Sequence, residues 1–263
     1  MRQTAATSEQ ASSFLSLIGH PQRWRLVEEL ARSDRRVNEL VDAVDAPSNL
    51  VSYHLRKLRQ GELVHERRSS ADARDVYYAL DLDRLRQLYS ETARSLHPGL
   101  MEPEGPQPEG SRRRDRAVRV LFLCTHNSAR SQMAEGILRH LGGERFEVFS
   151  AGSQPSRVHP LAIRVMAKRQ IDISGQKSKH MATFADETFD YVITVCDLAS
   201  EVCPVFPGAE RIHWSIPDPS AVEGAEREKA AAFEHAGNDL LTRIRYLVSL
   251  AGRKAKRPSH PPR

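Results

Sequence analysis

The sequence predicts a protein of two domains: one is mainly helical with a β-hairpin, and one is α/β with a four-stranded parallel sheet between helical layers. Its 263 residues are enough for two domains that each bury a core. The segment 98–117 is rich in proline, glycine and charge and has almost nothing to bury. Helical periodicity dominates before this segment, whereas apolar runs of strand length alternate with helices after it. We therefore expect domains at 1–97 and 118–251, a flexible linker at 98–117 and a basic disordered tail at 252–263.

Composition narrows the class of protein. The formal charge is +5, but residues 1–97 carry 15 basic and 14 acidic side chains, so net charge alone does not indicate DNA binding. No apolar stretch reaches membrane-spanning length and the first residues lack the apolar segment of a signal peptide, so we expect a cytoplasmic protein with no membrane partner. The three cysteines are too few for a disulfide framework and suit catalysis or redox chemistry better.

The first domain reads as helices followed by a hairpin. Apolar spacing predicts two helices between Ser12 and Ser33, interrupted at His20 and Pro21, and a short third helix over "VNELVDAVDA". A fourth helix, Ser48 to Gln60, follows at once, which gives a helix-turn-helix. The stretch "ELVHERRSSADARDVYYAL" alternates around a charged tip, Ser69 to Arg74, and predicts a hairpin, and "DLDRLRQLYSETARSL" predicts a last helix.

The helix at Ser48 to Gln60 has two different faces. The expected apolar face carries Leu50, Val51, His54, Leu55 and Leu58. The other face, where base edges of a major groove would be met, carries Ser48, Asn49, Ser52, Tyr53, Arg56 and Lys57. Arginines of the hairpin, Arg67, Arg68 and Arg74, are candidates for phosphate contacts. The alternative is a small helical bundle whose charged stripe is merely solvated.

The order of helices, hairpin and last helix over Ser8 to Leu96 closely resembles the ArsR/SmtB winged-helix repressors. This resemblance implies a homodimer formed by the first and last helices. It also implies binding to a double-stranded DNA operator through the fourth helix, Ser48 to Gln60, and through the hairpin wing, Leu63 to Tyr78. The domain departs from the arsenite sensors of that family because it contains no cysteine. Its histidines, His20, His54, His65 and His97, lack ligand-like spacing, so we predict no metal site.

The second domain alternates strands and helices. Strands are expected near Val118 to Leu123, Phe146 to Ala151, Tyr191 to Val195 and Glu210 to Trp214, with helices between them and a final one from about Gly224 to Ala251. This alternation predicts a parallel sheet covered on both faces. A ligand would bind at the carboxyl ends of the strands, where Cys124 falls.

Cys124 closes the apolar run "AVRVLFLC" and stands before the helix "SQMAEGILRHL". A cysteine taken alone is usually inert packing. A loop between a strand and a helix, however, points backbone N–H groups at an anion, and the helix N-terminus and Arg130 would both stabilise a thiolate there. The guanidinium of Arg130 also matches two oxygens of a tetrahedral oxyanion. Cys124 and Arg130 therefore predict a nucleophile beside an oxyanion cradle.

The stretch "CTHNSARSQMAEG" resembles the low-molecular-weight tyrosine phosphatase superfamily, and more closely its thioredoxin-coupled arsenate reductases. The similarity covers Val118 to Leu250 and includes "SAGSQPSRVHPLAIRVMAKRQIDISGQKSK", "VITVCDLASEVCPVFPG" and "IHWSIPDPS". It implies that Cys124 attacks arsenate or phosphate, which the loop residues hold: Thr125, His126, Asn127, Ser128, Ala129, Arg130 and Ser131. Within that loop Asn127 would brace the backbone and Ser131 would hydrogen-bond the thiolate. Asp218 would be the general acid.

The same resemblance assigns the other cysteines. Cys196 would attack Cys124 and release arsenite, and Cys203, in a loop-like stretch, would then attack Cys196 to leave a Cys196–Cys203 disulfide. Thioredoxin or another cellular thiol would reduce that bond, with no bound cofactor. Two alternatives stay open: a tyrosine phosphatase with two spare cysteines, and a regulator whose second domain only senses an oxyanion or the redox state. Weak phosphatase activity is expected under either enzyme reading, because phosphate and arsenate are nearly isosteric.

Overall fold

A computed structural model describes residues 8–97 and 116–254 of the chain. The chain divides into two compact units between positions 110 and 111, within the segment predicted as a linker. Most of that segment, residues 98–115, and the tail from residue 255 lie outside the described residues. Each unit is built around a hydrophobic core of its own. The predicted class is confirmed: a helical unit with a small sheet precedes an α/β unit with a four-stranded parallel sheet.

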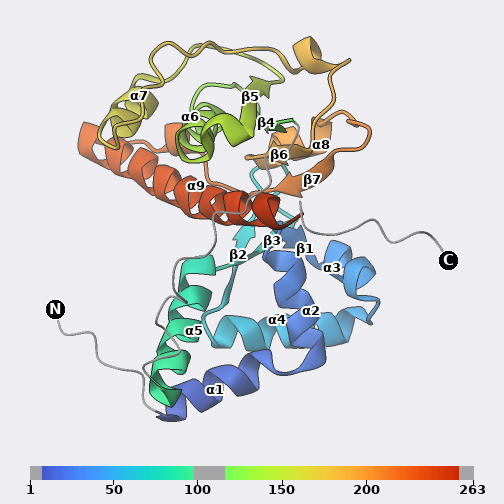
Figure 1. The fold of residues 1–263 in the computed structure, drawn as a ribbon. Coiled ribbons are helices and arrows are strands. Elements are labelled where there is room, and N and C mark those ends of the chain that lie inside the picture. Colours follow the sequence, from blue (N-terminus) through green and yellow to red (C-terminus); the bar gives the residue numbers. More distant parts are fainter. Residues whose placement is uncertain (1–7, 98–115, 255–263) are drawn as a thin grey trace. The chain divides into compact units, whose positions relative to one another are not determined.

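The N-terminal unit contains five helices within its described residues (Figure 1): α1 Ser8–Ile18, α2 Pro21–Leu30, α3 Val37–Val44, α4 Ser48–Gln60 and α5 Leu82–Leu96. Pro21 suits the first turn of α2, where its missing N–H has no helical partner, and the His20 ring accepts a hydrogen bond from the Gln22 amide. Asp81 caps α5 by accepting from the Arg84 amide at 2.8 Å. These local signals explain why the predicted helices form where they do.

The hairpin consists of β2 Val64–Arg68 and β3 Val76–Leu80, paired antiparallel. It lies within the stretch that the pattern predicted, and it ends two residues beyond the wing that the resemblance implies, because Leu80 pairs with Val64 and is buried. A third, two-residue strand that the sequence pattern did not reveal, β1 Arg35–Arg36, pairs with the other edge of β3. The prediction for Leu50 was wrong, since its side chain is 36% exposed while the other predicted apolar residues of α4 are buried.

The C-terminal unit holds four parallel strands in the order β5-β4-β6-β7. They are β4 Val118–Cys124, β5 Phe146–Gly152, β6 Tyr191–Thr194 and β7 Glu210–His213. The four α-helices described here are α6 Arg130–Gly142, α7 Pro160–Ala167, α8 Asp197–Val202 and α9 Glu226–Lys254. Figure 1 shows α9 running alongside α6 and α7, which also contact each other. This topology brings the carboxyl ends of β4 and β6 together in the middle of the sheet.

Two details of this unit differ from the prediction. The stretch between Cys196 and Cys203 is the short helix α8 rather than a loop. The final helix continues to Lys254, so the first three residues of the predicted tail are helical. Within the described part of the chain, no helix combines the length and apolar character needed to cross a membrane.

Candidate functional site

The Cys124 thiol lies at the mouth of the loop that joins β4 to α6. Its side chain is buried, and the sulfur accepts a hydrogen bond from the Asn127 amide at 3.1 Å. Ser131 Oγ lies 2.9 Å from the sulfur and accepts from Asn127 Nδ2, which leaves the hydroxyl proton for the sulfur. Two donors therefore face one sulfur beside the first turn of α6, an arrangement that stabilises a thiolate.

The carbonyl groups of the loop point away from the thiol. Those of Thr125, His126 and Ser128 accept from the amides of Gln154, Ser156 and His159, at 2.8 Å, 3.0 Å and 2.9 Å. When carbonyls of a short loop are turned outward and satisfied there, its N–H groups are left facing inward, where they form an anion-binding nest. The segment after β5 thus fixes the loop in a form that can cradle an oxyanion.

Asn127 holds this loop from inside. Its φ of 45° lies in the left-handed region, which asparagine tolerates better than most residues. Its side-chain nitrogen also donates to Ser150 Oγ at 2.8 Å, and its side-chain oxygen accepts from the Lys179 amide at 2.7 Å and from Gln132 at 3.1 Å. The amide of a completely buried residue is therefore satisfied on both sides, which suits the predicted bracing role.

Gly152, at the end of β5, is a part of the site that sequence reasoning missed. A Cβ at this position would lie 2.5 Å from the Thr125 carbonyl oxygen and 2.8 Å from the Asn127 nitrogen. Only glycine lets β5 approach the loop this closely. The signal that could have revealed it is the glycine that ends an apolar strand in "FEVFSAG".

The remaining loop residues are less enclosed. The exposed ring of His126 contacts the Gln154 carbonyl through Nδ1, while Ser128 Oγ donates to the Arg157 carbonyl. Ala129 is buried and precedes the first residue of α6. The side chains of His126 and Ser128 contact the segment after β5, so any contact these two residues make with an oxyanion would come from backbone N–H groups.

Arg130 and Asp218 meet in the structure although they are far apart in sequence. Arg130 Nη2 donates to Asp218 Oδ2 at 2.8 Å, and Nη1 donates to the Ile216 carbonyl at 2.8 Å. The other carboxylate oxygen of Asp218 accepts from the Ser220 amide at 3.0 Å. The predicted oxyanion-binding arginine and the predicted general acid therefore share an ion pair.

Cys196 lies two residues beyond the end of β6, the strand next to β4. Leu123 is paired with Thr194, and the Val195 amide donates to the Leu123 carbonyl at 2.8 Å, so the register continues with Val195 beside Cys124 and with Cys196 beside Thr125. The Cys196 sulfur is buried against the loop, 3.4 Å from Thr125 Oγ1. Burial raises the pKa of this thiol, and Arg130 opposes that shift. The second cysteine thus belongs to the same site as the first.

Cys203 stands at the other end of α8. It is partly buried, its sulfur contacts the Pro204 carbonyl, and burial raises the pKa of the thiol while Arg211 counteracts the shift. Seven helical steps of 1.5 Å separate it from Cys196 by about 10 Å. A disulfide needs Cα atoms within about 7 Å, so α8 must unwind before these two cysteines can join.

The predicted DNA-contacting side chains of α4 all lie outside the core. Ser48, Asn49, Tyr53, Arg56 and Lys57 are exposed and Ser52 is partly exposed. The ammonium of Lys57 lies over the Tyr53 ring, 5.8 Å from its centre. The polar face of α4 is thus exposed to solvent along the length of the helix.

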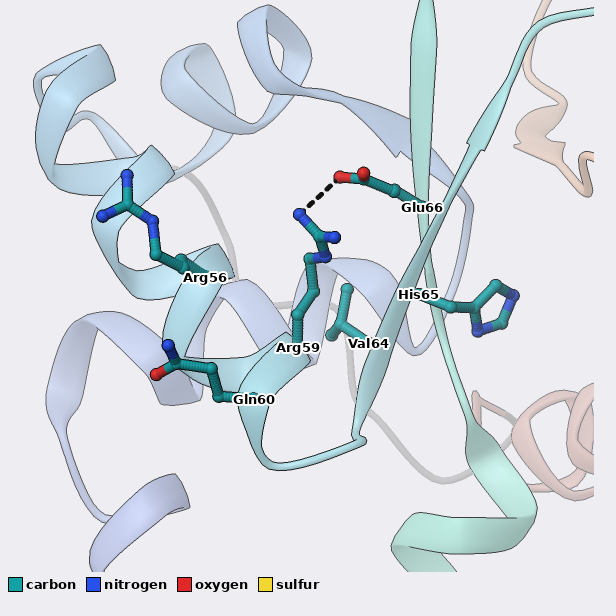
Figure 2. A pocket seen from close by; sticks show the side chains of 6 residues that line it. All are labelled: Arg56, Arg59, Gln60, Val64, His65 and Glu66. Carbon is teal, nitrogen blue, oxygen red and sulfur yellow. Dashed lines mark ion pairs between the residues drawn. The ribbon is translucent and has the colours of Figure 1, made fainter.

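A pocket of about 570 Å³ lies between the end of α4 and strand β2, and Figure 2 shows the residues that line it: Arg56, Arg59, Gln60, Val64, His65 and Glu66. Arg59 and Glu66 face each other in it and form an ion pair at 2.7 Å. This pair links the helix to the hairpin, so the two elements that would meet DNA keep a fixed spacing.

The hairpin arginines differ in how they are engaged. Arg67 and Arg68 donate to backbone carbonyls of the hairpin. Arg74, at the exposed tip, forms an ion pair with Asp72 at 2.7 Å, and hydrogen bonds from Arg74 lower the pKa of Asp72 to about 2. The carboxylate therefore stays ionised at neutral pH and offsets the charge that Arg74 would offer to a phosphate.

Comparison with known protein families divides the chain at the same place as the fold. Residues 119–256 match the model of the family described as low molecular weight phosphotyrosine protein phosphatase. Residues 20–66, which span α2, α3, α4 and the start of the hairpin, match the family described as bacterial regulatory protein, arsR family. Both resemblances drawn from the sequence are thereby confirmed.

Several relatives of the second domain are arsenate reductases. Those of Halalkalibacterium halodurans and Bacillus subtilis are 40% and 37% identical over 127 residues, which is 48% of this chain and 91% of each relative. A solved structure described as an arsenate reductase in the phosphate binding state is 33% identical, with a TM-score of 0.46 over 51% of this chain and 98% of that one. The chain belongs to the low-molecular-weight phosphotyrosine protein phosphatase family, and it joins this domain to an N-terminal helix-turn-helix region of the arsR family.

Proposed function

We propose that the protein is a bifunctional regulator and enzyme, which binds an operator through its first domain and reduces arsenate to arsenite with its second. The observation that carries the enzymatic part is the position of Cys196, buried beside the loop of Cys124 at the end of the neighbouring strand. A phosphatase has no use for a second thiol there, whereas a two-electron reduction requires one. The similarity to arsenate reductases supports the same choice.

In the first step the Cys124 thiolate attacks arsenic and forms a sulfur–arsenic bond, while one arsenate oxygen leaves. The inward N–H groups of the loop and the Arg130 guanidinium hold the remaining oxygens, after Arg130 has released Asp218 and Ile216. Asp218, set free by that exchange, takes a proton from a hydroxyl of the arsenate, which binds as dihydrogen arsenate, and passes it to the departing hydroxide, which leaves as water. Arsenic is still As(V) at this point.

In the second step the Cys196 thiolate attacks the Cys124 sulfur. The electron pair of the sulfur–arsenic bond passes to arsenic, which leaves as As(III) arsenite, and a Cys124–Cys196 disulfide forms. Cys196 belongs to the same chain and lies against Thr125, next to Cys124 in sequence, so this attack is intramolecular and the two sulfurs meet at a high effective concentration.

In the third step the Cys203 thiolate attacks Cys196, expels the Cys124 thiolate and leaves a Cys196–Cys203 disulfide. Because α8 holds these cysteines about 10 Å apart, its unwinding accompanies the step. The two electrons are then returned by a dithiol protein such as thioredoxin, or by another thiol of the reducing cytoplasm. No bound cofactor is required.

For the first domain, the proposal rests on the exposed polar face of α4 and on the arsR-family match. Within α1 and α5, which pack together, Leu15 and Tyr89 are 45% and 41% exposed. Large apolar side chains exposed on paired helices suit a homodimer interface. A dimer would present two copies of α4 to successive turns of a DNA major groove.

Steady-state arsenite production from arsenate, with thioredoxin, thioredoxin reductase and NADPH, tests the enzymatic proposal. We expect sustained turnover in the parent and about one equivalent of arsenite per protein in a Cys203→Ser variant, because that variant completes two steps and cannot export the disulfide. Absence of arsenite with thioredoxin and with small thiols, alongside hydrolysis of aryl phosphates, would replace the reductase by a phosphatase.

A further inference from the structure

A buried polar cluster lies directly behind Cys196 and takes no part in the three steps above. It consists of Asp197, the first residue of α8, with Thr194 at the end of β6, His213 at the end of β7, and Ser215. All four side chains are at least nine-tenths buried, and that of Asp197 is completely buried. A buried carboxylate lowers the stability of a fold unless it is well hydrogen-bonded. The presence of one directly after Cys196 therefore indicates a functional role for this cluster.

Two side chains of the cluster contact the same carboxylate oxygen of Asp197. Ser215 Oγ donates to Asp197 Oδ1 at 2.6 Å, and His213 Nε2 lies 3.2 Å from the same oxygen. The other ring nitrogen of His213 lies 2.8 Å from Thr194 Oγ1. The backbone just after Cys196 is therefore tied to the ends of two neighbouring strands of the sheet.

The other residues of α8 make fewer buried contacts than Asp197. Only Asp197 and Ala199 are buried in this helix, whereas Leu198 is 46% and Val202 57% exposed. Helix ends with few buried contacts open more easily than ends that are anchored. The end of α8 next to Cys203 is thus less anchored than the end next to Cys196.

This asymmetry matches what the relay needs. Cys196 must stay against the loop at Thr125 to attack Cys124, while Cys203 must travel toward Cys196. We propose, on the basis of the reductase function above, that Asp197, His213 and Ser215 are positioning residues for the relay. They hold Cys196 at the loop and confine the unwinding of α8 to its Cys203 end.

A single-turnover experiment on the full-length reduced protein tests this role. Arsenate is added, samples are quenched with a thiol-alkylating reagent at set times, and arsenite and the disulfide-linked peptides are quantified. We expect the rate constant of arsenite release to fall about tenfold in Asp197→Ala, because the attacking thiol is no longer held in place. The inhibition constant of inorganic phosphate should stay unchanged, since the loop of Cys124 is intact.

Two further variants keep the test decisive. Glu201→Gln removes an exposed carboxylate from the same helix and should react like the parent. Ser215→Ala removes one hydrogen bond to Asp197 with little loss of volume, and should slow arsenite release about threefold even if Asp197→Ala does not fold. A purely structural role would lower the amount of reactive protein but leave the rate constant unchanged.

The outcomes separate the two proposals. Parent-like rate constants in both Asp197→Ala and Ser215→Ala would overturn the positioning role while leaving the relay standing. Absence of arsenite and of any disulfide in the parent would overturn the reductase function itself.

Discussion

The guanidinium of Arg130 is joined to the carboxylate of Asp218 at 2.8 Å, across 88 residues of sequence. The arginine is 8% exposed and the carboxylate 34%, so the pair is partly shielded from water. We propose that arsenate competes with Asp218 for this guanidinium. Binding of the oxyanion and release of the general acid are therefore one exchange, and the acid becomes available when the substrate arrives.

This exchange predicts opposite effects of one substitution on binding and on catalysis. In Asp218→Asn the charge that competes for Arg130 is gone, so inorganic phosphate should inhibit about fivefold more tightly, which corresponds to about 1 kcal/mol. Arsenate turnover should fall by about 10² or more because the proton donor is lost. Inhibition and turnover kinetics measure both effects, and weaker phosphate binding would contradict the exchange.

Removing the brace of the loop should destabilise the second domain. Asn127→Ala leaves the buried hydroxyl of Ser150 and the Lys179 amide without their partner, and it forces alanine into a left-handed backbone conformation. We expect the free energy of unfolding to fall by about 3 kcal/mol. Denaturant unfolding followed by tryptophan fluorescence in a Trp24→Phe background, where Trp214 is the remaining tryptophan, reports on this domain. An effect below about 1 kcal/mol would show that the loop is held by other contacts.

The contact of Gly152 with the loop predicts a sharp difference between two glycines. Gly152→Ala places a methyl group against the Thr125 carbonyl and the Asn127 nitrogen, so the loop must shift. We expect turnover to fall about 100-fold, with a stability loss of about 1–3 kcal/mol. Gly175→Ala is the matched control, because no heavy atom lies within 4 Å of its added Cβ. Equal activity in the two variants would argue against the close approach.

The buried thiol of Cys196 predicts an alkaline pH profile for arsenite release. Burial raises the pKa of this thiol above its ordinary value, and only the thiolate attacks. In the Cys203→Ser variant, where the relay stops after this attack, the rate of arsenite release should keep rising beyond about pH 8.5. Stopped single-turnover reactions from pH 6 to pH 10 give the profile. A plateau below pH 8 would assign the limiting proton to another group.

At the tip of the wing, removing an acidic charge should strengthen DNA binding. Asp72 is paired with Arg74, so Asp72→Asn frees the guanidinium for a phosphate. We expect tighter binding to duplexes of any sequence, and a salt dependence steeper by about one ion. Fluorescence anisotropy at several salt concentrations measures both. The double variant Asp72→Asn, Arg74→Ala should bind DNA no more tightly than the parent. If the higher affinity persisted in the double variant, its cause would be the loss of a negative charge rather than the release of Arg74.

Some features followed directly from local sequence. The bounds of α4 agree with the apolar spacing of Val51, Leu55 and Leu58, and a proline, Pro47, stands directly before the first residue of the helix. Cys124 and Arg130 could be placed between a strand and a helix because the apolar run before Cys124 and the helical spacing of apolar residues after Arg130 are both visible in the local sequence. Helix α8 escaped prediction because six residues with two buried side chains leave almost no pattern to detect.

The sequence by itself determined the two domains, the helix-turn-helix and the nucleophile with its loop, because neighbouring residues generate these features. Tertiary structure alone decided that Arg130 pairs with Asp218, that Gly152 makes room for the loop, and that Cys196 lies beside the same loop. It also decided that Asp197 is anchored by His213 and Ser215. The physical reason is that such contacts depend on strand order and register, which place side chains from distant segments at one edge of the sheet.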